Sequence, residues 1–278
     1  MDEMEFLTGN ICDLPTIPVV ASTVLEMVGR EETSAADLQG IIEKDQALAG
    51  RVLKLSNSAL YGCRGSITTL STAIMIMGFT ILKAVVIAAS TKNIYKRFGH
   101  TEKYLWEHSI INGIASREIA MVVGVAKSEE AFLSGLLHDI GKVVINNNYP
   151  VQYKNIIRRV YCEGLDFAEA EKETFGYSHL DVGGLLAKKW KLPEEISTAI
   201  RHHHDFSLLS EPFLAKLSAI VNMANWVSLN MGVGGEYQGS MDLDSRQALL
   251  FLGLKNDELF EVVDRVKEAY MAEKEVFA

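Results

Sequence analysis

Histidine residues are concentrated in the second part of this chain of 278 residues. Six of its seven histidines follow residue 101, namely His108, His138, His179, His202, His203 and His204. A buried neutral imidazole has to find hydrogen-bond partners, so one buried histidine in a lobe is ordinary. Several imidazoles that converge favour a bound cation, because its charge satisfies the ring nitrogens directly. The clustering therefore predicts a metal site, on the condition that the fold brings these rings together.

The sharpest motif is LLHDIGK at residues 136–142. Its adjacent histidine and aspartate can direct a ring nitrogen and a carboxylate at one ion. We therefore interpret His138 and Asp139 as metal ligands, in preference to a hydrogen-bonded pair at a helix end. Gly141 is predicted to let the backbone turn there without steric cost. Lys142 has two interpretations, a phosphate contact or a partner of exposed carbonyls at the helix end.

Two other histidines lie in segments that suit the same site. His108 falls on a predicted amphipathic helix thirty residues before the histidine of LLHDIGK, and His179 lies in the segment GYSHLDVG. Each is interpreted as a metal ligand or, alternatively, as a helix histidine that donates to a backbone carbonyl. Upstream of His179, Glu171 and Glu173 are either acceptors that orient a ligand or part of a solvated helix face.

The histidine triplet at residues 202–204 cannot face one site as a whole. Successive positions of a helix differ in direction by about 100°, so neighbouring side chains diverge. We expect His202 and His203 to be the members that contribute to the site. His204 is expected to face solvent.

The elements that must position these side chains are predicted to be helices. Apolar residues recur at spacings of three and four along a chain with only five prolines, which indicates an all-α fold. Thr33 or Ser34 is predicted to cap one of the first helices. Later helices are predicted over residues 105–123, 128–137, 151–163, 167–175, 180–190, 194–202, 214–229 and 257–274.

Composition also suggests how the chain is divided. Residues 57–66 hold two glycines and are predicted to form a loop, and residues 230–239 hold four and are predicted to form a mobile loop. A polar stretch at residues 91–102 marks a soft boundary between two lobes. We therefore predict three parts, namely an N-terminal helical lobe at 12–97, a second helical lobe at 98–229, and a glycine-rich loop with a C-terminal helix at 230–278.

Charge and cysteine usage exclude several classes of partner and compartment. The 27 basic and 36 acidic residues give a net charge of −9, which argues against a nucleic-acid partner. The three cysteines show no CxxC spacing and no even-numbered framework, as is typical of a reducing cytoplasm. The acidic start of the chain lacks a basic region followed by an apolar run, so no secretory signal is expected.

The most apolar stretch, residues 73–90, is about as long as a membrane span. Lys83 lies at its middle, and a central lysine costs about 3 kcal/mol on insertion scales. Gly78 also lies within the stretch. Two short buried helices are therefore predicted here, and no membrane partner.

The motifs together resemble a known family. LPTIP at residues 14–18, DQALAGRVLKLSNS at 45–58 and AIMIMG at 73–78 precede the histidine-aspartate motif. In this combination the chain resembles the HDOD signalling branch of the HD superfamily of metal-dependent phosphohydrolases, over about residues 14–204. The resemblance implies an all-α fold, with a multi-helical HD-like core and an N-terminal helical lobe.

The resemblance also implies a ligand set for a first metal ion. In the HD superfamily a histidine, the histidine-aspartate pair and a later aspartate hold the metal, which correspond here to His108, His138 and Asp139 with Asn225 at the last position. Asn225 offers a neutral carbonyl oxygen in place of a carboxylate, so one negative charge is missing from this site. Weaker metal retention or an altered choice of metal is expected to follow.

Further histidines support a second ion in the binuclear members of the superfamily. These correspond to His179 together with His202 or His203. The implied cofactor is thus one or two divalent ions of iron, manganese, nickel or zinc. The cyclic-dinucleotide branch has Gly-Tyr-Pro shortly after its histidine pair, whereas this chain continues DFSLL at residues 205–209, so that substrate class is poorly matched.

Three functions remain open on the sequence. The leading hypothesis is a cytoplasmic regulatory module, non-catalytic or weakly catalytic, that keeps a divalent-metal pocket and acts on a signalling protein partner. The alternative is a metal-dependent phosphohydrolase of a phosphate-containing small molecule, in which Asp139 and Lys142 serve catalysis. The third is a structural scaffold with an empty pocket.

Overall fold

The computed structural model describes residues 11, 14–28, 30, 32–58, 67–95, 99–232 and 241–277. These residues form helices and connecting turns, with no strand among them, so the predicted all-α fold is confirmed. Of the two predicted loops, residues 59–66 and 233–239 lie outside the described part. The first helices are α2 (Val19–Val28), α3 (Ala35–Ile42), α4 (Gln46–Ser56), α5 (Leu70–Thr91) and the short η2 (Lys92–Ile94).

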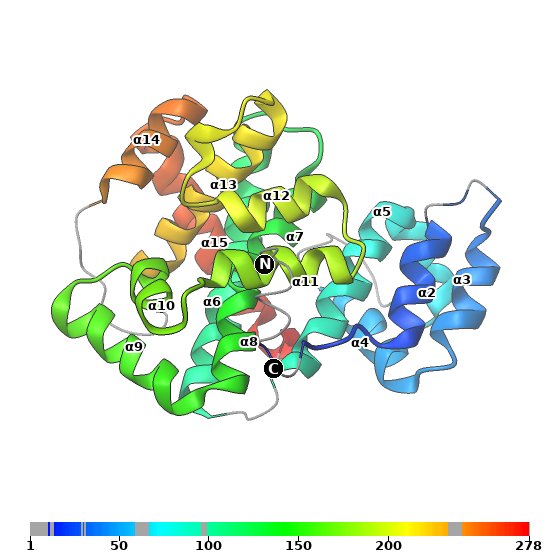
Figure 1. Ribbon diagram of the computed structural model, residues 1–278. Coiled ribbons are helices and arrows are strands. Elements are labelled where there is room, and N and C mark those ends of the chain that lie inside the picture. The colour runs from blue at the N-terminus through cyan, green and yellow to red at the C-terminus, as the bar shows by residue number, and fades with distance from the viewer. Residues whose placement is uncertain are drawn as a thin grey trace.

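The longer remainder of the chain forms the larger helical group (Figure 1). Its helices are α6 (His100–Val122), α7 (Ser128–Leu137), α8 (Ile140–Asn148), α9 (Pro150–Glu163), α10 (Phe167–Phe175), α11 (His179–Lys189), α12 (Glu194–His202), η3 (Phe206–Leu208), α13 (Pro212–Asn230), α14 (Leu243–Leu252) and α15 (Asn256–Phe277). Figure 1 shows α2, α3 and α4 at one end of the molecule, with α5 running from them toward this group. One continuous cluster of buried apolar side chains extends from α2 to α15.

Local capping explains where several N-terminal helices begin. Ser34 accepts from the backbone N–H of Asp37, and the Asp37 carboxylate accepts from the Ser34 N–H, which forms a capping box at α3. Asp45 caps α4 by accepting from the Leu48 N–H. Of the two residues predicted to cap a first-lobe helix, Ser34 is the one that does so.

The helix α5 is broken at Gly78, where φ is 70° and ψ is 175°. The apolar stretch therefore forms two helical pieces, in agreement with the prediction. Among the described residues, α5 is the one helix long and apolar enough to cross a membrane by length and composition, and 56% of its most apolar window is buried within the protein. It packs against α2, α3, α4 and α7, as a core helix does.

The second group of helices is built around α6, which packs along α7, α13 and α15. The helix α11 packs on α8 on one side and on α12 on the other. Glycines allow the close approaches. A Cβ at Gly141 would overlap the backbone carbonyl of His179, and a Cβ at Gly183 would lie 2.7 Å from the Ile200 side chain. Because Gly141 and Gly183 have no side chain, α8 and α12 can pack closely against α11.

The role of Gly141 differs from the predicted one. Gly141 lies in the first turn of α8 and its φ is not in the left-handed region, so no special backbone turn requires a glycine there. It is needed for contact with α11 instead. Two helices, α8 and α14, were not predicted, whereas α7, α10 and α12 have the predicted bounds. The three-part division of the chain remains a prediction.

A short extended segment ties the start of the chain to the end of α11. The carbonyl of Leu14 accepts from the Lys189 ammonium at 2.8 Å, and the carbonyl of Pro15 accepts from the Trp190 indole N–H at 3.1 Å. Glu26 of α2 forms an exposed ion pair with Lys191 at 3.3 Å. This N-terminal strap, residues 14–18, joins the first helices to the second group.

The packing of Gly141 gives a stability prediction. Gly141→Ala should lower the free energy of unfolding by about 1–3 kcal/mol, because the added methyl group overpacks the contact between α8 and α11. The control is Gly50→Ala, at an exposed position of α4 with no atom within 4 Å of the new Cβ. That change should stabilise the helix by about 0.5–1 kcal/mol. Urea unfolding of the two variants measures both effects, and equal stabilities would contradict the assignment.

Candidate metal centre

Six side chains with metal-binding atoms gather where four segments meet. The segments are α6 with His108, the junction of α7 and α8 with His138 and Asp139, the start of α11 with His179, and the residues just after α12 with His203 and His204. Figure 1 shows α6, α7, α11 and α12 next to one another in the larger group. The donor atoms form two triads, each with all atoms within 4.8 Å of one another.

The first triad consists of His108, His138 and Asp139, all buried. The Oδ2 atom of Asp139 lies 3.5 Å from His108 Nε2 and 3.2 Å from His138 Nε2. The two imidazole rings are tilted, with centroids 5.2 Å apart. One carboxylate oxygen and two ring nitrogens therefore face a common point.

The second triad consists of His179, His203 and His204. The ring centroids of His203 and His204 are 4.2 Å apart, and each lies 5.7 Å from the centroid of His179. His179 Nε2 lies 3.6 Å from Oδ1 of Asp139. Asp139 thus presents one oxygen to each triad and lies between them.

Hydrogen bonds on the outer ring nitrogens orient the histidines. Nδ1 of His138 donates to the carbonyl of Gly135 at 2.7 Å, and Nδ1 of His203 donates to the carbonyl of Ile200 at 2.9 Å. Nδ1 of His108 donates to the Ser228 hydroxyl at 3.1 Å, which in turn donates to a backbone carbonyl. With Nδ1 protonated, the inward Nε2 carries a lone pair, which is the form of imidazole that binds metals.

Glu171 orients His179 through two hydrogen bonds. Its Oε2 accepts from Nδ1 of His179 at 2.7 Å and from the backbone N–H of His179 at 2.6 Å, and its Oε1 accepts from the Tyr153 hydroxyl at 3.0 Å. Burial, together with the charge of Glu171, raises the pKa of Tyr153 well above its usual value, so the hydroxyl remains a donor. Of the two interpretations of Glu171, the structure agrees with the acceptor and not with a solvated face, because its side chain is fully buried.

Three buried atoms at the centre have no hydrogen-bond partner among the described residues: Asp139 Oδ1, His179 Nε2 and His203 Nε2. The first two face each other across 3.6 Å, and with Nδ1 of His179 donating to Glu171, the uncharged ring presents the lone pair of Nε2 to the carboxylate. Two buried acceptors that point at each other are unfavourable unless a cation lies between them. This donor set therefore fits a divalent metal ion.

The charge state of the centre suits the same interpretation. Burial and the neighbouring His138 lower the pKa of His108 to about 3, and burial with the neighbouring His204 lowers the pKa of His203 well below its usual value. Burial alone would raise the pKa of Asp139, but His138 and Lys142 outweigh it, so the pKa is well below its usual value. The site therefore combines the neutral rings of His108 and His203 with the ionised carboxylate of Asp139.

Lys142 contacts the centre directly. Its ammonium lies 2.8 Å from Oδ2 of Asp139 and 4.3 Å from the centre of the Phe167 ring. Both interactions hold it inside the protein, where it is 7% exposed. The lysine therefore compensates part of the buried charge of Asp139. Among the described residues its ammonium contacts Asp139 and Phe167 and no helix-end carbonyl.

Asn225 of α13 lies beside the first triad. Its side chain hydrogen-bonds to His108, and its backbone carbonyl accepts from the Ser228 hydroxyl at 2.9 Å. Asn225 thus lies next to one member of the first triad. Whether its amide oxygen binds metal remains a proposal.

Two expectations about the histidine triplet require correction. His202 is in neither triad, because its Nδ1 contacts the Asp205 carboxylate at 2.9 Å, and His204 is half-buried within the second triad instead of facing solvent. The helical rule of 100° per residue does not apply here, since α12 ends at His202. Sequence reasoning also missed Ser228 and Tyr153, which carry no motif and are recognised only through their contacts.

Comparison with protein families gives one match over most of the chain. A model of the HDOD domain matches residues 14–206. A protein of Treponema pallidum (strain Nichols), described as uncharacterized, is 24% identical over 220 residues, which cover 77% of this chain. The match covers 42% of that protein, so this chain spans less than half the length of the curated relative.

Two solved structures have a similar fold along nearly the whole chain. A protein of Shewanella amazonensis SB2B named "Putative phosphohydrolase" has a TM-score of 0.76 and 25% identity, with 98% of each chain covered. A protein of Marinobacter aquaeolei VT8 named "Putative signal transduction protein" has a TM-score of 0.77 and 19% identity, covering 99% of this chain and 65% of that one. The second likeness shows the fold alone.

The contacts of Glu171 predict a stability effect. Glu171→Gln should lower the free energy of unfolding by about 1–3 kcal/mol, because an amide cannot accept from all three buried donors. The control is Glu173→Gln on the same helix, where the carboxylate is 59% exposed and pairs with Arg159. That change should stay within about 0.5 kcal/mol. Chemical denaturation measures the difference, and similar stabilities would count against the role of Glu171.

The lowered histidine pKa values predict a pH effect on metal-free protein. His108 and His204, with pKa values of about 3 and about 4, and His203 remain neutral in the folded state where unfolded histidines protonate. Stability is therefore complete above about pH 6.5 and falls as the pH drops toward 4, by about 1.4 kcal/mol per pH unit for each histidine.

Urea unfolding at several pH values in the presence of a chelator measures this slope. His203→Asn removes one of the three histidines and should make the slope shallower. Stability that is independent of pH between 6.5 and 4 would contradict the neutral state of these rings.

Proposed function

This chain belongs to the HDOD domain family, and from that premise we propose that it is a regulatory signalling module with a divalent-metal site in its helical core. One observation supports the metal site above others. In a buried space His179 Nε2 and Asp139 Oδ1 lie 3.6 Å apart, and neither atom has a hydrogen-bond partner among the described residues. A cation is the simplest partner for both.

The proposed ligands follow the two triads. His108, His138 and Oδ2 of Asp139 would hold one ion, and Oδ1 of Asp139 with the second triad would hold another. Imidazole nitrogens with one carboxylate suit iron, nickel or zinc, and manganese where oxygen ligands contribute. Such an ion supplies positive charge and Lewis acidity when it is bound.

Burial of the first triad favours a regulatory role over a catalytic one. The side chains of His108, His138 and Asp139 are at most 3% exposed, and those of His179 and His203 are fully buried. The ammonium of Lys142 already occupies Oδ2 of Asp139, and the Phe167 ring packs on it. A phosphate ester would have to displace these groups to reach the first triad.

Metal binding in the core could also change the outer surfaces of the helices that supply the ligands. The proposed ligands come from α6, the α7–α8 junction, α11 and the end of α12, so metal binding would hold four segments together. A ligand shifts a conformational equilibrium by its difference in affinity for the two states. A signalling protein that contacts the outer surfaces of these helices could then distinguish the metal-bound state from the metal-free one.

The second candidate is a metal-dependent phosphohydrolase, and the second triad favours it. His204 is only half-buried, and the Asp166 carboxylate is near enough to His204 to influence its charge. This side of the centre offers the more open approach for a phosphate-containing small molecule. Asp139 and Lys142 would then be the groups closest to the reacting phosphate.

Elemental analysis tests the metal site. Full-length protein purified without chelator should contain one or two divalent ions per chain, and His203→Ala should lose metal because it removes a lone pair from the centre. The matched control is His202→Ala, since His202 contacts Asp205 and should leave metal content unchanged. Less than about 0.1 ion per chain in gently handled wild-type protein would contradict the proposal.

Activity measurements separate the two candidate functions. Protein with bound metal is tested on cyclic dinucleotides and simple phosphate esters. The regulatory proposal predicts no turnover, because the buried donors exclude substrate. Turnover that disappears in Asp139→Ala but persists in His202→Ala would instead establish the phosphohydrolase.

A further inference from the structure

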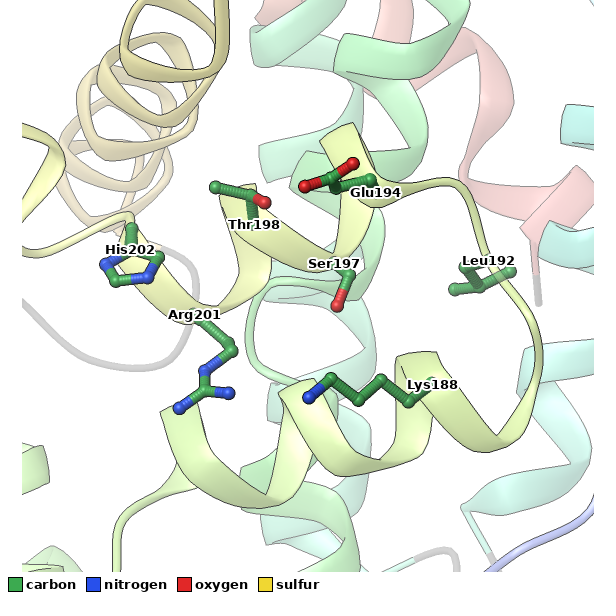
Figure 2. A pocket seen from close by; sticks show the side chains of 7 residues that line it. All are labelled: Lys188, Leu192, Glu194, Ser197, Thr198, Arg201 and His202. Carbon is green, nitrogen blue, oxygen red and sulfur yellow. The ribbon is translucent and has the colours of Figure 1, made fainter. Parts of the chain in front are cut away.

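A cavity of about 460 Å³ lies between α11 and α12, separate from the two triads (Figure 2). Lys188 of α11 lines it on one side, and Ser197, Thr198 and Arg201 of α12 line it on the other. No member of the two triads is among its lining residues. Its volume is within the range of sites that bind small organic molecules.

The cavity brings two cations together. Figure 2 shows the ammonium of Lys188 and the guanidinium of Arg201 pointing toward one another from facing helices, with the Ser197 hydroxyl directed into the same space. Two cations and a hydroxyl that face one space offer several hydrogen-bond donors to an anion there. Within the described part of the chain, no carboxylate forms an ion pair with Lys188.

The guanidinium of Arg201 is held in place by the packing of its stem. A Cβ at Gly184 would lie 2.5 Å from Cγ and Cδ of Arg201, so the arginine stem crosses α11 where that helix has no side chain. This contact restricts the rotamers of Arg201 before any ligand binds. A guanidinium fixed in this way is prepared for two parallel hydrogen bonds to a phosphate or carboxylate.

The charge balance of the cavity contrasts with that of the whole chain. The protein carries a net charge of −9, whereas the cavity lining has two cations and one carboxylate, Glu194. In Figure 2 the Glu194 carboxylate lies toward Thr198 and away from the two cationic groups. The cationic end of the cavity is thus a local exception on an acidic protein.

We propose that this cavity binds a small organic molecule through an oxyanion, either a phosphate or a carboxylate. Arg201 donates two hydrogen bonds to the oxyanion, and Lys188 and Ser197 donate one each. The apolar Leu192 lines the cavity as well and contacts the carbon part of the ligand. Because Arg201 is two residues before His203, the ligand would contact the same helix that leads into the second triad.

The test uses full-length protein that has been freed of metal with a chelator. Thermal unfolding is followed against inorganic phosphate, succinate and sodium chloride at equal ionic strength. Phosphate or succinate should raise the unfolding temperature in a saturable way, and chloride should not. Preference for phosphate identifies a phosphorylated ligand, preference for succinate identifies a carboxylate ligand, and equal responses support the oxyanion site in general.

Variants connect the response to the cavity. Lys188→Gln and Arg201→Gln should each weaken anion binding about tenfold, the loss of one charge-assisted hydrogen-bond group. Lys154→Gln removes an exposed lysine of α9 and should leave binding unchanged. Lys188 is itself exposed, so its variant is expected to fold, and circular dichroism checks both cavity variants.

Two results would overturn the site. One is that neither oxyanion gives a saturable response beyond that of chloride. The other is that both cavity variants bind phosphate or succinate as tightly as wild type. Because the protein is metal-free, these results are independent of whether the histidine-aspartate centre binds metal.

Discussion

The buried negative charge of Asp139 is the constraint on which the rest of the structure depends. Removing a carboxylate from water costs several kcal/mol, and here only Lys142 among the described side chains provides a permanent positive charge within 2.8 Å. The imidazoles around it present lone pairs because their outer nitrogens donate elsewhere. The fold thus places the lone pairs of several ring nitrogens around a buried anion. Such an arrangement is energetically favourable when a cation is bound among these atoms.

Much of the fold follows from hydrophobic periodicity, and the exceptions have physical causes. The bounds of α7, α10 and α12 agree with the predictions because their apolar positions recur at helical spacing. The helix α8 was missed because Gly141 was interpreted as a turn and Asn146–Asn148 resemble a loop. Contact with α11 outweighs these weak local preferences, and such a contact between distant segments is invisible in a local pattern.

The site could be predicted in part for similar reasons. His138 and Asp139 are adjacent in sequence, so their common direction needs no knowledge of the fold. The choice between His202 and His204 required the last residue of α12, and helix ends are the least certain feature of a sequence-based prediction. Glu171 has glutamates on both sides of it at alternate positions, and only tertiary packing decides which of the three is buried.

The N-terminal strap has a consequence for how the chain acquires its structure. The hydrogen bonds from Lys189 and Trp190 to the strap join residues 175 positions apart. During synthesis the first helices leave the ribosome long before α11 has been synthesised. Until then the N-terminal strap lacks its hydrogen bonds to Lys189 and Trp190. Contacts between such distant residues close large loops, which slows folding. We therefore expect docking of the first helices onto α11 to be a late event in the maturation of the protein.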